Sequence, residues 1–373
     1  MANNKDKGFN LWFHFYGWVA MSVFLPFDRQ ILTAPVAESS WLALGLTQIP
    51  ESSWKQSLTI VQPWRANYLA LRQAGFCCFP ELSAKTAEFD GGLLQLGKHK
   101  GQNQNRFVDL MRRVKVGGMI VVSGDKSAGV LSFLKWVNTI DVYQNKINSG
   151  TNVTSDGVTA NVVTGKLAKN HGVIFWLDKR HDLSENVVSH LVIKPQLFDG
   201  DFTTEAGMFS HGRVDGGSKM LIKYMDRIIF GKTADFGAGW GYLSCQALKM
   251  TKKLTALDLY EADYNALEAA RRHVTSCGSS LAINYYWRDI TGEPIEDIYD
   301  TILANPPFHE GRAADVALGQ KFIEIAAQRL KPGGCLLMVA NRQLPYEATL
   351  NKVFRKVFVL EEQNGFKVFE ARK

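Results

Sequence analysis

The sequence is poor in cysteine and has no pattern of paired metal ligands. Five cysteines occur among 373 residues, and two of them, Cys77 and Cys78, are adjacent. An odd number leaves one thiol unpaired, and the cysteines show no paired zinc-ligand spacing. We therefore expect reduced thiols in a cytoplasmic protein, with neither a disulfide framework nor a bound metal.

A clear membrane-spanning run is also missing. The most apolar segment, Phe9 to Phe27, is at the short end for a spanning helix and contains Asn10, His14 and Pro26. No small-residue cleavage pattern follows it before Asp28, which argues against a signal peptide. We expect residues 1–27 to form a packed or ill-ordered apolar extension without a membrane role.

Acidic residues are outnumbered. There are 36 Asp and Glu against 43 Lys and Arg, which gives a net charge of +7. Such an excess attracts polyanions, of which nucleic acid is the commonest, although an ordinary basic enzyme is the alternative. Five clusters could contact phosphates or could be solvated helix faces: Lys98-His99-Lys100, Arg112-Arg113-Lys115, Lys179-Arg180-His181, Arg271-Arg272-His273 and Lys352-Arg355-Lys356.

The composition is that of a folded chain long enough for two domains. Hydrophobic residues make up 46% and charged residues 21%, which excludes a disordered protein. In the second half, apolar runs alternate with amphipathic stretches, a pattern typical of an α/β fold with a mostly parallel sheet. The expected strands are Thr233–Phe236, Leu254–Leu259, Leu281–Tyr286, Asp300–Ala304, Cys335–Val339 and a hairpin of Val357–Glu361 with Lys367–Ala371; the first two expected helices are Tyr242–Met250 and Ala262–Val274.

The first half repeats this order. Phe89-Asp90 resembles Tyr299-Asp300, and the segment from Arg113 to Ile120 resembles the one from Arg329 to Leu336. We infer two copies of one α/β domain, although Gly-Gly turns before strands are common. The boundary is expected within residues 194–203, which separates a domain of residues 28–195 from one of residues 201–373.

The first copy lacks the polar motifs of the second. Gln95-Leu96-Gly97-Lys98 stands in the place of Asn305-Pro306-Pro307-Phe308, and nothing between Gln30 and Gly75 matches the glycine turn at Gly237. We expect residues 28–195 to be a degenerate copy that binds RNA or serves as a scaffold.

The run Asp235-Phe236-Gly237-Ala238-Gly239-Trp240-Gly241 lies between an expected strand and an expected helix. Glycines there allow a tight turn and the close approach of a ligand. The Gly-x-Gly-x-Gly spacing differs from the one that dinucleotide sites favour and argues against a dehydrogenase. Asp258, about twenty residues on, is expected to end the next strand and to accept from ribose hydroxyls; a helix N-cap or a solvated acid is the alternative.

Two further motifs follow later strands. Asp289 could accept from the amino group of an adenine, and Ile290 could cover the ring. In the Asn305 loop, two prolines stiffen the backbone. The Asn305 side-chain oxygen and the Pro306 carbonyl could orient an amino group for attack on an electrophilic methyl group, and Phe308 could stack on a base. The alternative is a rigid turn with a core phenylalanine.

Together these motifs resemble a class I S-adenosylmethionine-dependent methyltransferase that methylates amino groups. Phe308 followed by His309-Glu310-Gly311, and the ending Gly365-Phe366-Lys367-Val368-Phe369, resemble more specifically the bacterial ribosomal RNA guanine-N2 methyltransferases, with the small-subunit enzymes fitting best. The segments Gly207-Met208-Phe209-Ser210 and Asp215-Gly216-Gly217-Ser218 also match that family. Trp240 is bulkier than the residue usual at its position.

This resemblance implies two tandem Rossmann-like methyltransferase domains, the N-terminal copy degenerate. It implies S-adenosylmethionine as the cofactor and ribosomal RNA or the small ribosomal subunit as the partner of a monomer, without metal. Phe209 is then assigned to the cofactor, and Phe308, His309, Arg312 and Lys367 are assigned to the substrate.

Two alternatives remain open at this point. The same loop could methylate another amino substrate, such as a large-subunit guanine, a protein glutamine or a DNA adenine. A non-catalytic RNA-binding protein could also retain the fold, although intact Asn305 and Gly237 argue against it.

Overall fold

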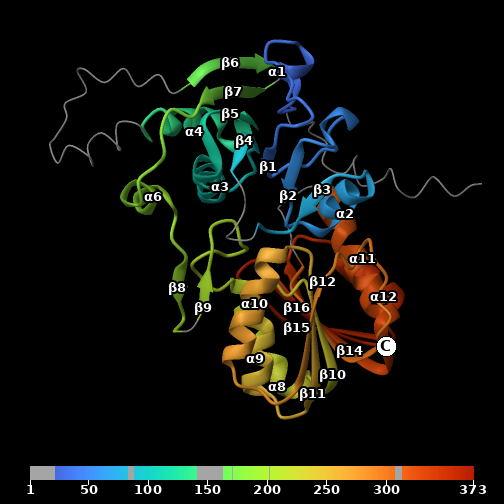
Figure 1. Ribbon diagram of the computed structural model, residues 1–373. Coiled ribbons are helices and arrows are strands. Elements are labelled where there is room, and N and C mark those ends of the chain that lie inside the picture. The colour runs from blue at the N-terminus through green and yellow to red at the C-terminus, as the bar shows by residue number, and fades with distance from the viewer. Residues whose placement is uncertain (1–21, 83–87, 141–162, 170, 201, 307–312) are drawn as a thin grey trace, which may run out of the picture. The chain divides into compact units, whose positions relative to one another are not determined.

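The computed structural model describes residues 22–82, 88–140, 163–169, 171–200, 202–306 and 313–373 (Figure 1). The chain divides into two compact units, one ending at Lys194 and the other beginning at Pro195, and residues 63–66 group with the second unit. Among the described residues, each unit contains one seven-stranded sheet.

In the first unit the strand order is β3-β2-β1-β4-β5-β7-β6. The strands are β1 (Trp41–Leu44), β2 (Leu58–Val61), β3 (Cys77–Phe79), β4 (Phe89–Gln95), β5 (Val114–Asp125), β6 (Val163–Lys169) and β7 (Gly172–Asp178). The helices are α1 (Leu25–Asp28), η1 (Ser52–Trp54), α2 (Arg65–Gln73), α3 (Lys100–Arg113), η2 (Lys126–Ala128), α4 (Val130–Val137) and α6 (Glu185–Leu191).

In the second unit the order β12-β11-β10-β13-β14-β16-β15 repeats the first. The strands are β10 (Gly231–Phe236), β11 (Leu254–Glu261), β12 (Ala282–Trp287), β13 (Tyr299–Ala304), β14 (Leu330–Asn341), β15 (Lys356–Gln363) and β16 (Phe366–Arg372), after the separate pair β8 (Gln196–Phe198) and β9 (Phe202–Thr204). The helices are α7 (Gly216–Leu221), η3 (Ile222–Tyr224), α8 (Met225–Ile228), α9 (Tyr242–Met250), α10 (Tyr264–Ser276), α11 (Ala313–Arg329) and α12 (Tyr346–Val353).

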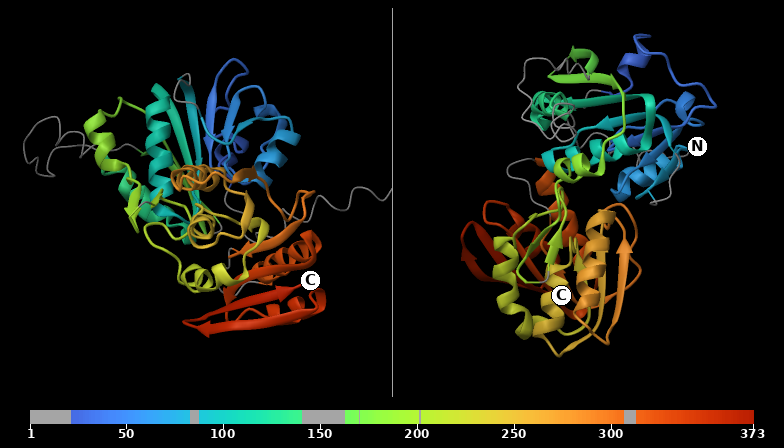
Figure 2. Two further views of the ribbon diagram at one scale, coloured as in Figure 1. Left: turned by 90° about the horizontal axis from the view of Figure 1, so that it is seen from below. Right: turned by 60° about the vertical axis from the view of Figure 1, so that its left-hand side comes forward.

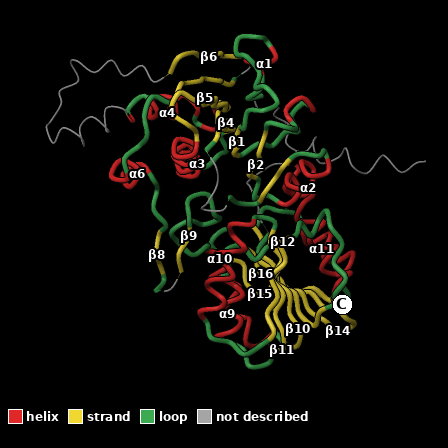
Figure 3. Tube along the Cα trace, viewed as in Figure 1, coloured by secondary structure: helices red, strands yellow, loops and turns green. Residues whose placement is uncertain are grey.

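The second sheet is covered on both faces. Helices α9 and α10 pack on one face through Leu243 and Leu267, and α11 and α12 pack on the other through Ile323 and Leu350. Figure 3 shows the strands of this sheet side by side between these helices, and Figure 2 shows the red β15–β16 hairpin at one edge. Its core strands β10 to β14 pair in parallel, so their carboxyl ends share one edge of the sheet.

The prediction of two tandem Rossmann-like domains is confirmed by the matching strand orders. The two copies also share an irregularity and an ion pair. The register of β4 with β5 shifts between Phe89 and Gly91, as that of β13 with β14 shifts between Tyr299 and Thr301. Beside each shift a lysine pairs with an aspartate, Lys115 with Asp90 in the first copy and Lys331 with Asp300 in the second.

The expectation that nothing in the first copy matches the glycine turn is wrong in one detail. Gly45 follows β1 with φ +76°, as Gly237 follows β10 with φ +75°. A Cβ at Gly45 would lie 2.6 Å from the Gln95 carbonyl oxygen and 2.8 Å from the Arg106 guanidinium. The buried Gln95 amide, in the place of Asn305, exchanges hydrogen bonds with Thr47. The Gln95 carbonyl and the Arg106 side chain therefore occupy the space beside this turn in the first copy.

Part of the apolar extension belongs to this first core. Phe24 and Phe27 are buried against Trp41 and Trp54, whereas the extension up to residue 21 lies outside the described residues. No helix in the described part of the chain is both long enough and apolar enough to span a membrane.

Candidate active site

The glycine turn lies at the carboxyl end of β10, where the chain order of the sheet reverses. Strand β10 is flanked by β11 and β13, and ligands of open α/β sheets bind at such a switch point. The amides of Gly237 and Ala238 donate to the Tyr260 carbonyl at 2.9 and 3.0 Å. Gly239 has φ +54°, and no atom of the described residues lies within 4 Å of an added Cβ. The backbone at Gly239 therefore offers an open cradle for a ligand.

The acid at the end of β11 is Glu261, not Asp258. Glu261 Oε2 accepts from the Gly239 amide at 2.7 Å, and Oε1 accepts from the Asp263 amide at 2.8 Å. Burial raises the pKa of this carboxyl, an effect that these backbone donors partly offset. A carboxylate at this place beside the glycine turn can also accept from the hydroxyls of a nucleoside.

Asp258 is enclosed within the sheet, which corrects its assignment to the cofactor. It lies three residues before the end of β11 and is fully buried. Its oxygens accept from Asn284 Nδ2 at 2.8 Å and Tyr299 OH at 2.9 Å, and Lys232 Nζ lies 3.2 Å away. The strand predicted from the sequence ends at Leu259, two residues before the end of β11 in the structure. For this reason Glu261 was not recognised as the acid at the end of the strand.

Asp235 contributes a buried carboxyl at the start of the turn. Its Oδ2 accepts from Ser244 Oγ at 2.7 Å, while Oδ1 is buried and has no partner among the described residues. Burial raises the pKa of Asp235 to about 7. An acceptor of this kind fits a ligand that brings its own donor.

We expect the free energy of unfolding of the ligand-free protein to fall as pH rises from about 4 to about 7. The Asp235 carboxyl binds its proton up to about pH 7 in the folded state, against a usual pKa of 3.8, so the folded state holds more protons in this window. Linkage then places the effect at up to about 4 kcal/mol. Urea unfolding at several pH values should show a smaller fall for Asp235→Asn. Parallel pH profiles for the two proteins would contradict the assignment.

Asp289 and Ile290 follow β12, as expected. Asp289 Oδ1 accepts from the amide and the hydroxyl of Thr291 at 2.9 and 2.7 Å. Among the described residues no donor reaches Oδ2, and Ile290 is buried. This arrangement holds the carboxyl firmly and leaves one oxygen for an exocyclic amine.

The Asn305 amide is oriented by two residues that lie about ninety positions earlier in the chain. Its Nδ2 donates to Asp215 Oδ2 at 3.0 Å and to Ser218 Oγ at 2.8 Å. Asp215 also caps α7, where it accepts from the Ser218 amide at 2.9 Å. An ionised carboxylate only accepts, so the amide nitrogen must face Asp215 and the Oδ1 oxygen must face away. Among the described residues, no donor occupies Oδ1.

Sequence reasoning found the Asp215–Ser218 segment by resemblance but did not connect it to Asn305. The Phe366 ring supports the segment: it lies 3.3 Å from an added Cβ at Gly216 and 3.0 Å from one at Gly217. A side chain at either position would be in tight contact with this ring. Pro306 is buried beside Asn305, whereas Pro307, Phe308, His309 and Arg312 lie outside the described residues.

The bulky Trp240 points into the core. Its ring packs against Phe198, Phe202 and Tyr242, and its Nε1 donates to the Phe209 carbonyl at 2.9 Å. Trp240 thus ties the Phe209 loop to the glycine turn without filling the ligand space. Phe209 itself has a half-exposed side chain beside this turn.

Lys367 does not present a free ammonium to a substrate. Its Nζ lies 2.5 Å from Glu347 and 3.8 Å from Glu362, and the side chain is 18% exposed. Lys367 thus has acidic partners in the fold, and its contact with the substrate stays a prediction. No group of three or more potential metal ligands occurs within the described ranges.

Comparisons with known proteins agree with this geometry. The methyltransferase small domain family matches residues 199–370. Ribosomal RNA small subunit methyltransferase C of Pseudoalteromonas atlantica is 28% identical, over 77% of this chain and 78% of the relative. The protein of the same name from Shewanella loihica is 27% identical, over 80% and 81%.

A solved structure extends the likeness to both units. The T. thermophilus 16S rRNA N2 G1207 methyltransferase, solved with AdoMet and guanosine, has a TM-score of 0.69 and is 21% identical, over 92% of this chain and 90% of that one. At this identity the likeness shows a shared fold.

Proposed function

We propose that this chain methylates the exocyclic N2 amine of a guanine in small-subunit ribosomal RNA, with S-adenosylmethionine as the methyl donor. Two likenesses support the proposal: the match of residues 199–370 to the methyltransferase small domain family and the similarity to ribosomal RNA small subunit methyltransferases C. The observation that carries this proposal is the oriented Asn305 amide. Its free oxygen suits a substrate that presents N–H donors.

The residues around the glycine turn fit the methyl donor. Glu261 lies where ribose hydroxyls would bind, and Asp289 with Ile290 would hold the adenine. Asp235 Oδ1 has no partner in the part of the chain that the structure describes, and the backbone at Gly239 is open there; both leave room for the amino-acid part of the cofactor. When bound, the cofactor supplies an electrophilic methyl group on a sulfonium, so the chain itself needs no strong acid or base.

In this mechanism the chain acts by positioning. The lone pair of a guanine amino group is delocalised into the ring, which makes the amine a poor nucleophile. Two acceptors, Asn305 Oδ1 and the Pro306 carbonyl, would hold its N–H bonds and direct the lone pair toward the methyl group. Asp215 and Ser218 are positioning residues, because they hold the amide in the accepting orientation. Stacking of the base on Phe308 stays a prediction.

In this proposal the two domains have different functions. Residues 201–373 carry out the chemistry, while residues 28–195 bind RNA or serve as a scaffold. The filling of the first glycine turn by Gln95 and Arg106 supports a non-catalytic first domain.

A labelling experiment tests the proposal. Tritiated S-adenosylmethionine is incubated with the protein and, separately, small ribosomal subunits, free ribosomal RNA, DNA and a release factor. We expect label in RNA, as N2-methylguanine after nuclease digestion. Label found only in protein or DNA, or none in any substrate, would refute the assignment.

A further inference from the structure

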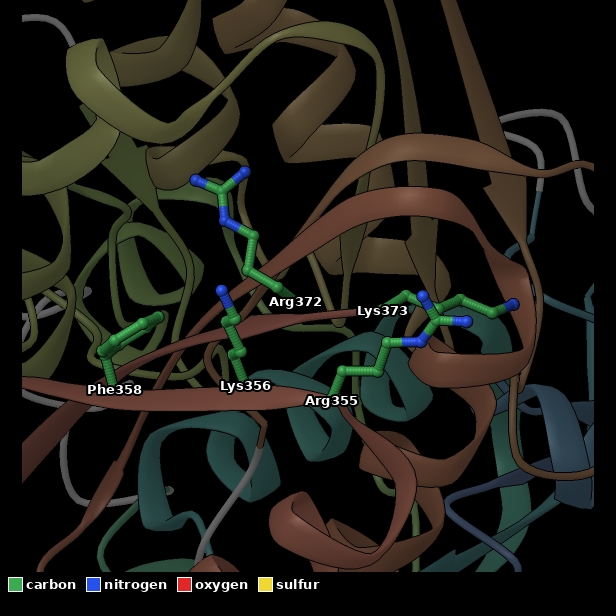
Figure 4. Close-up of a pocket in the computed structure, with 5 residues that line it drawn as sticks. All are labelled: Arg355, Lys356, Phe358, Arg372 and Lys373. Atoms are coloured by element: carbon green, nitrogen blue, oxygen red, sulfur yellow. The ribbon is translucent and has the colours of Figure 1, made fainter.

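A basic pocket lies at the far end of the second sheet from the glycine turn. Its volume is about 420 Å³, and it is lined by Arg355, Lys356, Phe358, Arg372 and Lys373 (Figure 4). The lining residues come from the start of β15 and the end of β16. Arg372 pairs with Cys335, whereas Phe366 pairs with Asn341 at the carboxyl end of β14. The pocket is therefore about 20 Å along the strands from the candidate active site.

The cations of this pocket are only partly neutralised. Lys356 and Arg372 are direct partners in the antiparallel ladder, an arrangement in which like charges repel. Arg372 pairs with Glu370 at 2.6 Å, and Lys373 Nζ donates to the Leu330 carbonyl. Across the described ranges, no acidic partner is found for Arg355 or Lys356. An anion in the pocket would relieve this repulsion.

In three other basic clusters of the sequence, cations have acidic partners or are buried within the fold. Lys179 is buried and donates to the Val114 carbonyl. Further cations of these clusters form ion pairs with neighbouring acids: Arg112 with Glu185, Arg113 with Asp109, Lys115 with Asp90, Arg271 with Glu268 and Arg272 with Glu205. Among the described residues, Arg355 and Lys356 thus lack the acidic neighbours that these three clusters have.

An exposed aromatic ring completes the pocket. Phe358 is 48% exposed and lies opposite Glu370 in the ladder, two residues from Lys356. Exposure of a phenylalanine beside unneutralised cations is unfavourable in water alone but suits a ligand that combines phosphates with planar bases. Aromatic platforms next to basic grooves bind single-stranded nucleic acid in this way.

We propose that this pocket binds a single-stranded segment of RNA, with phosphates against Arg355, Lys356 and Arg372 and one base on the Phe358 ring. The choice of RNA rests on the proposed function, whereas the phosphate and base contacts rest on the pocket itself. At this distance from Asn305, the pocket holds a part of the substrate remote from the methylated nucleotide.

Fluorescence anisotropy with the full chain and a labelled single-stranded RNA of about ten nucleotides tests this inference. The double variant Arg355→Gln/Lys356→Gln should raise Kd at least tenfold and lower the slope of log Kd against log salt by about 1.4. Phe358→Leu should raise Kd about fivefold and leave the slope unchanged. The control Lys252→Gln/Lys253→Gln removes the same charge from exposed lysines outside the pocket and should change Kd less than twofold.

The inference fails if the wild type does not bind the RNA, or if the double variant binds as the control does while its thermal unfolding is unchanged. Binding is measured without cofactor, so it is independent of methyl transfer. Absence of transfer by the wild type refutes the proposed function and leaves the comparison of binding intact.

Discussion

Replacing Asn305 with alanine is expected to lower kcat for methyl transfer about 100- to 1,000-fold while the Kd for S-adenosylmethionine stays within about twofold. The variant removes the acceptor that orients the substrate amine and touches none of the residues placed around the cofactor. The loss should appear in kcat, since alignment of the lone pair matters in the transition state. Single-turnover kinetics with ribosomal RNA and calorimetric titration of the cofactor measure the two quantities separately.

Asp215→Ala is expected to lower kcat by a smaller factor than Asn305→Ala does. It removes one of the two acceptors of Asn305 Nδ2 and leaves Ser218 at 2.8 Å. We expect a fall of kcat about 10-fold, smaller than that of Asn305→Ala, because the amide can then rotate and present its nitrogen to the substrate. Thermal unfolding is recorded for both variants, since Asp215 also caps α7. A kcat for Asn305→Ala within about fivefold of the wild type would remove the basis for the positioning mechanism.

Glu261 and Asp258 lie on the same strand, but we expect their substitutions to change different quantities. The change at Glu261 should weaken cofactor binding, and the change at Asp258 should lower the free energy of unfolding. Glu261→Gln is expected to weaken cofactor binding about 10- to 100-fold, because it removes a charged acceptor beside the glycine turn. Asp258→Asn should leave the cofactor Kd within about threefold and lower the free energy of unfolding by roughly 1–3 kcal/mol. The amide leaves Lys232 with Asp297 as its remaining acidic partner and weakens the contacts with Asn284 and Tyr299.

Cofactor titration and urea unfolding of both variants decide between the two acids. Each substitution is nearly isosteric, so the two proteins serve as controls for one another. If Asp258→Asn abolished cofactor binding and Glu261→Gln had no effect on it, the original placement of Asp258 at the ribose would be restored and the geometry at Gly239 would need another explanation.

The sequence by itself was sufficient to predict the duplicated α/β fold and to propose where the site lies. Hydrophobic periodicity is a local property, and it predicted the parallel strands of the second sheet. Gly237, Gly239 and Gly241 allow the positive φ values of this turn, and two prolines after a strand restrict φ, whatever the tertiary context. The glycine turn and the Asn305 loop could therefore be recognised without contacts.

Only the tertiary structure decided which side chains serve these motifs. The end of β11 is set by its pairing with β10 and β12, which carries Glu261 to the sheet edge and leaves Asp258 inside. The partners of Asn305 come from a segment ninety residues away. Trp240 packs in the core and donates to the Phe209 carbonyl, and Lys367 forms an ion pair with Glu347. Such contacts depend on strand register and on packing between distant segments, which a local pattern does not encode.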